Sequence, residues 1–386
     1  MKYRMPDYYK NFKCIADKCP MTCCEGWAIV IDDKSLEKYV DCSNSRYICK
    51  HIDQNEKIFL QNGSRCSFLN RSNLCDLYNN VGEDYLCKTC RRYPRHFENY
   101  GSLIEAALSM SCPEAAKLIL SKNNHNKYRI RDNSYIVRKD KEVDNELLET
   151  LLFVRKTVFK IMKQNDSFEH KMIDILWLSE GVQKKLFEYE KLGIKNKITY
   201  YKKKYFGAIK EYCNNISKQD NSKIMCGLSR KTIFKSYIDM LKGLEKINDN
   251  WPKDMDYITS ILYDSNSDEE YIELCRDFEA YMESRYYEYD NIFNYFVYTY
   301  LLGSVYDYNI QAMIKFSLLC TLIIKEWGMA KWLGNNKVFS KEDNEKICYL
   351  FSRQIEHSDN NLMSLEGILS AHPMFCFENM VQVIRK

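Results

Sequence analysis

The chain has 386 residues and a formal net charge of +4, and 45% of its residues are hydrophobic. This mild positive charge gives no reason to expect a nucleic-acid partner, because domains that bind nucleic acids carry a stronger basic bias. The longest apolar stretch, 316–324, is too short to cross a bilayer, and residues 1–12 lack the apolar core of a signal peptide. We therefore expect a cytoplasmic protein with no membrane partner, long enough for about two or three domains.

Cysteines are concentrated near the start of the chain. There are 17 of them, and 11 lie at or before Cys112. In a reducing compartment such clusters are more often metal ligands or redox groups than disulfides, and the odd count also argues against a disulfide scaffold. The clustering therefore predicts a cysteine-rich domain.

Residues 1–121 are irregular in pattern, with close-spaced Cys, Gly and Pro and few periodic apolar runs. A segment of this kind buries little apolar surface and needs cross-links or a metal to hold its shape. The apolar run Trp27–Asp32 predicts one short strand. We assign residues 1–121 to a metal-binding domain and the polar, Asn/Lys-rich stretch 122–141 to a linker.

Residues 142–386 have the pattern of a helical domain. Only Pro252 and Pro373 interrupt the chain after Pro113, and long proline-free stretches permit long helices. Apolar periodicity predicts helices around 147–159, 173–186, 230–247, 268–284, 290–306, 309–329 and 340–358. Ser340 and Asp343 form a start like a capping box for the last of these. The predicted fold class is mainly α, with a small irregular cysteine-rich metal-binding domain followed by a helical domain.

Nine clustered cysteines are the predicted metal ligands: Cys14, Cys19, Cys23, Cys24, Cys66, Cys75, Cys87, Cys90 and Cys112. Thiolates are soft ligands that suit both zinc and iron–sulfur clusters. A structural zinc site usually takes two short cysteine pairs, and the adjacent Cys23 and Cys24 fit a single tetrahedral ion poorly. Iron–sulfur clusters accept more varied spacings. We therefore expect an iron–sulfur cluster, with zinc as the alternative metal. The spacings do not identify which four cysteines are the ligands, and they do not distinguish one metal site from two.

The remaining cysteines carry less information. Cysteines scattered through helical sequence are usually buried small hydrophobes, and we assign Cys213, Cys226, Cys275, Cys320, Cys348 and Cys376 to this class. The spacing Cys19-x-x-x-Cys23 begins the CxxxCxxC motif of radical S-adenosylmethionine enzymes, but Gly26 occupies the third position. Because strand–helix alternation is absent as well, we exclude that family.

Several motifs taken together resemble a known family. They are Cys14-x4-Cys19-x3-Cys23-Cys24-x-Gly26-Trp27, Cys66-x-Phe-Leu, Cys75-x-x-Tyr78, Cys87-x-x-Cys90-x-x-Tyr-Pro-Arg95 and Ser111-Cys-Pro-Glu114. This set resembles the flagellin lysine-N-methylases, and its N-terminal part is similar to the wider CxxCxxCC group of zinc- or iron-chelating domains. The later stretches 291–298 and 351–357 also resemble that methylase family.

The resemblance implies an enzyme that transfers methyl groups from S-adenosylmethionine to lysine side chains of flagellin and contains a 4Fe-4S cluster. The residues themselves support only the cluster. No Gly-rich loop announces a common methyltransferase fold, so the donor site is not visible as a motif. The alternative is a non-catalytic zinc- or iron-chelating module whose helical domain binds a protein partner.

Lysine methylation sets a chemical requirement that directs the choice of site residues. The lysine amine attacks only when neutral, and its ordinary pKa is about 10.4, so the site needs a base or a desolvating pocket. Within the stretch 351–357 we assign Arg353, Glu356 and His357 to catalysis; the alternative is a structurally hydrogen-bonded histidine. Arg91 and Arg95 beside the cysteines are assigned to the donor carboxylate, or else they screen the charge of the cluster.

Overall fold

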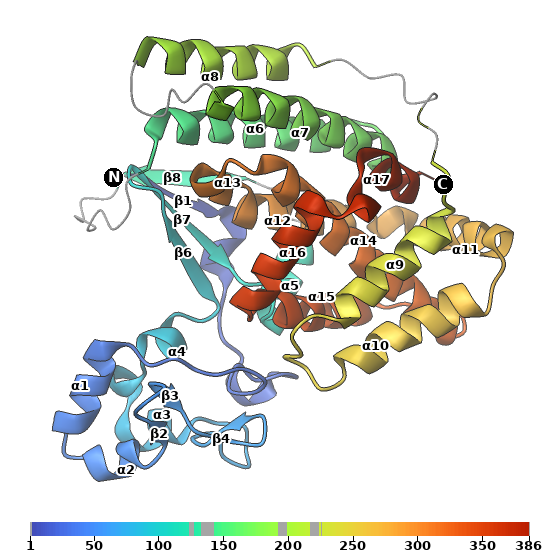
Figure 1. Cartoon of the computed structure of the whole chain (residues 1–386). Coiled ribbons are helices and arrows are strands. Elements are labelled where there is room, and N and C mark those ends of the chain that lie inside the picture. The colour runs from blue at the N-terminus through green and yellow to red at the C-terminus, as the bar shows by residue number, and fades with distance from the viewer. Residues whose placement is uncertain are drawn as a thin grey trace.

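The computed structural model describes residues 2–122, 127–132, 143–191, 199–216, 224 and 226–385. Figure 1 shows a small lobe of short elements that projects from a larger body of long helices. The mainly α fold predicted from the sequence is confirmed. None of the described helices has the length and apolar character needed to span a bilayer.

The lobe lies within residues 14–92 and has a core of its own. Its helices are α1 (Asp33–Asp41), α2 (Ser45–Cys49), α3 (Asp76–Val81) and α4 (Lys88–Arg92), and its strands are β2 (Ile52–Asp53), β3 (Ile58–Phe59), β4 (Gln61–Asn62) and β5 (Arg65–Cys66). Ten buried residues form its core: Ile29, Ile31, Tyr39, Ile48, Ile52, Phe59, Cys66, Phe68, Leu77 and Cys87. Such a core is small and buries correspondingly little apolar surface.

The strand predicted at Trp27–Asp32 is wrong. Only Val30 forms a bridge, with Ile58, and the backbone bonds of the run end there. The reason is the lack of a partner of sufficient length, since β3 spans two residues and already pairs with β2.

A four-stranded sheet that the sequence did not predict joins the lobe to the body. Its strands are β1 (Lys2–Pro6), β6 (Arg95–Asn99), β7 (Leu103–Leu108) and β8 (Tyr128–Asp132), in the order β6-β7-β1-β8. Strands β6 and β7 form an antiparallel hairpin, β1 runs parallel to β7, and β8 pairs antiparallel with β1. Strand β8 falls within the predicted linker 122–141, of which residues 123–126 and 133–141 lie outside the described residues.

The body consists of long helices around α14. Its helices are α5 (Pro113–Leu120), α6 (Asn145–Met162), α7 (Phe168–Lys191), α8 (Thr199–Asn214), α9 (Arg230–Lys242), α10 (Trp251–Ile258), α11 (Asp268–Met282), α12 (Tyr287–Tyr300), α13 (Ser304–Asp307), α14 (Ile310–Gly334), α15 (Lys341–Glu356), α16 (Asp359–Ala371) and α17 (Phe377–Ile384). Helix α14 is buried over most of its length and packs against α7, α12, α15 and α16. The capping box predicted at Ser340 and Asp343 is confirmed and starts α15.

The core of the body extends into the first 121 residues. Phe12, Leu108, Cys112 and Ala116 are buried in the same cluster as the body helices, and α5 packs on α12 and α15. The sheet and α5 thus belong to the body in packing, while the segment between β1 and β6 forms the lobe. This arrangement brings the loop that carries Cys23 and Cys24 next to α15.

Candidate functional site

The junction between lobe and body is organised by Arg353 in the last turn of α15. Its side chain is buried, with 4% of its surface exposed. Nη2 donates to the carbonyl oxygens of Met21 (2.9 Å) and Thr22 (3.0 Å), and Nη1 donates to that of Glu25 (3.1 Å). Nε donates to the carbonyl of Ser111 at 3.1 Å. The guanidinium therefore anchors the loop that carries Cys23 and Cys24, while its assigned catalytic role stays a prediction.

Glu356 lies one turn further along α15, inside the body. Its Oε2 accepts hydrogen bonds from the Tyr295 hydroxyl at 2.8 Å and from Ser109 Oγ at 3.2 Å. Burial raises the pKa of Glu356 to about 7. The carboxyl group therefore exchanges its proton near neutral pH, which is the range that suits a general acid or base.

His357 caps the end of α15 and is held by aromatic rings. Its Nε2 lies 2.8 Å from Ser111 Oγ, and its ring lies 4.7 Å from the ring of Trp27 and 6.0 Å from that of Tyr93, measured between centroids. Burial, followed by the nearby Arg353 charge, lowers the pKa of His357 to about 3. The imidazole is therefore neutral at physiological pH, and within the described part of the chain its Nδ1 has no hydrogen-bond partner.

A chain of hydroxyl groups connects these two residues. Ser111 Oγ lies 2.8 Å from His357 and 2.6 Å from Ser109 Oγ, and Ser109 donates to Glu356. Glu356 in turn accepts from Tyr295, whose hydroxyl also accepts from the Met110 backbone N–H at 3.0 Å. Because every neighbouring pair is within hydrogen-bonding distance, the row can pass a proton between a neutral imidazole and a carboxyl group.

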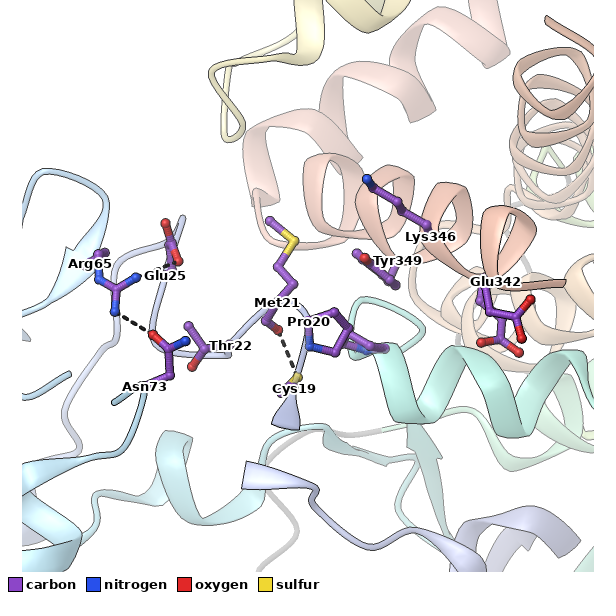
Figure 2. A pocket seen from close by; sticks show the side chains of 12 residues that line it. Cys19, Pro20, Met21, Thr22, Glu25, Arg65, Asn73, Glu342, Lys346 and Tyr349 are labelled. Atoms are coloured by element: carbon purple, nitrogen blue, oxygen red, sulfur yellow. Dashed lines mark hydrogen bonds and ion pairs between the residues drawn. The ribbon is translucent and has the colours of Figure 1, made fainter. Parts of the chain in front are cut away.

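A cleft of about 710 Å³ opens between the lobe and α15. It is lined from the lobe side by Cys19, Pro20, Met21, Thr22, Glu25, Arg65 and Asn73, and from the body side by Pro113, Glu342, Glu345, Lys346 and Tyr349. Figure 2 shows Cys19 and Met21 in the middle, with the α15 side chains opposite the Arg65 side. Burial raises the pKa of Glu345 to about 7.

The three residues assigned to catalysis are outside the described lining of this cleft. Arg353 instead holds the backbone of Met21, Thr22 and Glu25, which form the opposite wall. Arg353 thus holds the backbone of this wall from outside the cleft.

Five of the nine predicted metal ligands lie in or against the core of the lobe: Cys24, Cys66, Cys75, Cys87 and Cys90. Burial, together with the neighbouring thiols of this group, raises the pKa of Cys66 to about 12. A second neighbourhood contains Cys14, Cys19 and Cys112, since burial and then the other two thiols raise the pKa of Cys112 to about 11. Cys24 of the first group and Cys14 of the second both raise the pKa of Cys23. Cys23 therefore lies near both groups.

Two close pairs within the lobe favour ionised sulfur. A hydrogen bond from Cys23 lowers the pKa of Cys24 to about 7, and a hydrogen bond from Cys90 lowers that of Cys87 to about 7. The thiolate is the form that binds metals, so each pair offers one ready ligand. Among the described residues, however, no three His, Cys, Asp or Glu side chains stand close enough together to hold a metal ion. The nine cysteines remain predicted ligands whose type and grouping suit a soft metal.

Arg91 and Arg95 point to different partners. Arg91 is exposed and donates to the carbonyl oxygen of Leu86 at 2.7 Å, whereas the Arg95 guanidinium lies 5.1 Å from the centre of the Phe12 ring. Their assigned role as ligands of the donor carboxylate stays a prediction.

Sequence reasoning missed several residues of the junction. Ser109, Ser111 and Tyr295 complete the hydroxyl row, and Glu345 lines the cleft. Two of them lay within motifs that were already noted, Ser111 before Cys112 and Tyr295 in the stretch 291–298. No spacing rule connects these motifs with α15, so only the fold brings them together.

The fold and the junction together define a class: a mainly α protein in which a thiol-rich lobe docks on a helical body through the end of α15. The profile of the FliB lysine N-methylase C-terminal domain family matches residues 155–383, which is more than half of the chain. The chain therefore belongs to this family.

Curated relatives match a shorter part of the chain. The flagellar biosynthetic protein FliU of Salmonella muenchen is 26% identical over 129 residues, which cover 30% of this chain and 75% of that protein. The lysine-N-methylases of Salmonella choleraesuis and Salmonella typhimurium are each 26% identical over 129 residues, covering 30% of this chain and 32% of theirs. The aligned stretch thus spans about a third of the length of either lysine-N-methylase. No solved structure matches this chain.

Proposed function

We propose that this protein is a methyltransferase that transfers methyl groups from S-adenosylmethionine to lysine side chains of flagellin. The observation that carries the proposal is the family match over residues 155–383, which includes Arg353, Glu356 and His357. The names of the relatives, flagellar biosynthetic protein and lysine-N-methylase, support the reaction and the substrate.

In the proposed reaction the neutral lysine nitrogen attacks the methyl carbon of the sulfonium donor. The carbon–sulfur bond breaks, its electron pair stays on sulfur, and the proton of the amine passes to a base. Glu356 is the better final acceptor, since its pKa is about 7 while burial holds that of His357 at about 3. His357 and the hydroxyls of Ser111 and Ser109 carry the proton to it.

The cleft beside α15 is the proposed entrance for the substrate lysine. Glu342 places a carboxyl group on one wall, beside Lys346 and the partly protonated Glu345, where it attracts an alkylammonium group. Tyr349 adds an apolar ring surface for the methylene groups of the lysine, and it is 6% exposed.

We also propose that the lobe binds a 4Fe-4S cluster through four cysteines of the group around its core, with zinc as the alternative metal. The lowered pKa values of Cys24 and Cys87 and the burial of Cys66 support this choice of ligands. When bound, the cluster cross-links the elements of a lobe whose own apolar core is small.

The test is methyl transfer by protein prepared without oxygen and loaded with its metal. With S-adenosylmethionine and the cognate flagellin present, intact-mass spectrometry is expected to show additions of whole methyl groups on flagellin lysines. Glu356→Gln is expected to lower the rate by about 10²–10⁴ if it is the terminal base. An exposed carboxylate elsewhere supplies the control, Glu283→Gln.

Two negative outcomes are distinguishable. No transfer by the folded, metal-loaded wild-type protein would contradict the enzyme and favour the non-catalytic chelating module. An unchanged rate in Glu356→Gln would leave the enzyme standing and remove Glu356 from the proton path.

A further inference from the structure

A second large concavity lies on the body, away from the cysteine-rich lobe. It has a volume of about 1040 Å³ and is bounded by β1, β8 and α6, which lie together in Figure 1. We call it the basic groove and define its rim by Lys127, Arg129, Lys156, Lys160 and Lys163. Neither the predicted catalytic residues nor the cysteines line it.

Most of the positive charge on the rim has no ion-pair partner within the described part of the chain, Arg129 being paired with Asp7. Lys156, Lys160 and Lys163 are exposed; the first two stand one turn apart on α6, and Lys163 is its C-cap residue, also at helical spacing. Within the described chain none of these three lysines forms an ion pair, although like charges four residues apart repel along a helix. The repulsion between these lysines lowers the stability of the free helix, and an anionic partner would relieve that repulsion.

Two of the three acidic groups nearest the groove, Asp7 and Glu105, are already engaged. Asp7 accepts from Arg129 Nε at 2.6 Å. The buried Glu105, behind the groove, is bonded to Arg155 at 2.7 Å and to Arg4 at 3.3 Å. Of the groove lining, only Glu149 remains as a second acidic side chain beside Asp7. The electrostatic potential inside the groove is therefore positive.

The floor of the groove is apolar, and its aromatic rings are stacked on other rings of the protein. Leu152, Phe153 and Phe159 line it together with Tyr128. The Tyr128 ring stacks on Phe159 at 5.0 Å and on Tyr298 at 4.5 Å, measured between ring centroids. Since the protein's own rings occupy these faces, the floor offers no open platform for nucleic-acid bases, which bind by stacking.

Strand β8 gives the groove a backbone edge. It is the outer strand of the described sheet and pairs on one side only, with β1. Its Ile130 side chain is 54% exposed. An extended peptide can add to such an edge through main-chain hydrogen bonds, while its side chains enter neighbouring pockets.

We infer that the basic groove binds an extended acidic segment of a protein partner, with the partner's carboxylates on the α6 lysines and its apolar residues on the floor. This inference concerns binding alone and does not depend on methyl transfer. It combines three observations on the described residues: a row of lysines without ion pairs, a preformed apolar floor, and a strand that pairs on one side only.

The experiment measures binding of a fluorescent peptide of alternating glutamate and valine to the full-length, metal-loaded protein by anisotropy. We expect saturable binding that weakens as salt rises, and no binding of the matched peptide with glutamine in place of glutamate. The variant Lys156→Ala/Lys160→Ala/Lys163→Ala should bind about tenfold more weakly, since three exposed charge pairs are lost. The control Lys253→Ala/Lys331→Ala/Lys341→Ala removes three exposed lysines elsewhere on the body and should bind as wild type.

Three results would overturn the inference. The first is absence of salt-sensitive peptide binding, and the second is an equal loss of affinity in both triple variants, which would show a non-specific charge effect. The third is tighter binding of a single-stranded oligonucleotide with the same number of charges, which would assign the groove to nucleic acid. No methyl donor is present, so failure here is separate from failure of the proposed enzyme.

Discussion

At the scale of single residues, Arg353 has more hydrogen bonds across the junction than any other side chain described above. Its bonds go to four backbone carbonyls in two segments, at Met21, Thr22, Glu25 and Ser111. A planar fork of donors is required for this geometry, and a lysine ammonium is a single point charge that cannot reproduce it.

We therefore predict that Arg353→Lys loosens the loop around Cys23 and Cys24. The free energy of unfolding should fall by about 2–3 kcal/mol, the range for hydrogen bonds to a charged group, as measured by denaturant titration. Limited proteolysis should cut this loop faster than in the wild type, whereas Arg276→Lys, at an exposed site, should change neither. Unchanged stability and protection, with methyl transfer lost, would indicate that Arg353 acts in catalysis instead.

Glu356 gives a pH-dependent prediction. Its folded pKa of about 7 lies above the ordinary value of 4.5, so the protonated form is favoured by folding. This stabilisation is complete below pH 4.5 and is lost as the pH rises through 7. Relative to Glu356→Gln, the wild type should lose about 3 kcal/mol of unfolding free energy between those limits.

Denaturant titrations of both proteins across this pH range provide the measurement. Taking the difference between them cancels the contribution of other titrating groups, such as Glu345 and His357. A difference that does not change with pH would mean that Glu356 titrates normally and is unsuited to accept a proton at pH 7.

At the scale of elements, α6 combines a structural face and a charged face. One side is buried against the body through Leu147, Leu151 and Val154, while the other presents the lysine row of the basic groove. The lysine row lowers the free energy of unfolding of the protein without its partner, since each like-charged pair destabilises a helix by about 0.2–0.5 kcal/mol.

Replacing Lys156, Lys160 and Lys163 by alanine should therefore raise the free energy of unfolding by about 0.5–1 kcal/mol, because repulsion is removed and alanine favours helices. Thermal unfolding followed by circular dichroism measures this, with the Lys253, Lys331 and Lys341 triple variant as reference. A clear loss of stability would instead show that the lysine stems support the packing of α6.

Helices were largely predictable from the sequence, and the sheet was not. The predicted 268–284 and 340–358 correspond to α11 and α15, because apolar periodicity and a capping box are local signals. Strand β7 has no such signal: all six of its residues are buried, including Glu105, whose partner Arg155 lies 50 residues away. A buried charge in a strand is explained only by its distant partner.

The candidate site was predicted in the same uneven way. Motifs selected Arg353, Glu356 and His357, and the structure brings all three to the junction. Ser109 and Glu356 are 247 positions apart in the sequence, so their hydrogen bond follows from the packing of the β7–α5 connection on α15. No local pattern could have indicated it.

At the scale of the whole molecule, two cores of unequal size predict two levels of stability. The lobe core has ten buried residues, whereas the body core runs from the sheet to α17. Removing the metal proposed for the lobe should therefore release hydrogen-exchange protection in residues 33–92 while the body remains protected.

Variants sharpen this prediction. Cys24→Ser and Cys87→Ser should lower metal content, while Cys213→Ser and Cys320→Ser, in the body core, should leave it unchanged. Elemental analysis of purified protein is the measurement. Equal metal loss in both groups, or full protection of the lobe after chelation, would contradict a structural metal in the lobe.

The hydrogen bonds of Arg353 also affect which amino-acid substitutions the junction tolerates. Its contacts with the loop are made entirely to main-chain oxygens, which every amino acid supplies. These contacts with Arg353 therefore do not depend on which side chains stand at Met21, Thr22 and Glu25, although Glu25 also pairs with Arg65 and Met21 packs against the body core. In a saturation-mutagenesis library scored for lobe docking, position 353 should accept arginine alone, while the three loop positions tolerate many residues.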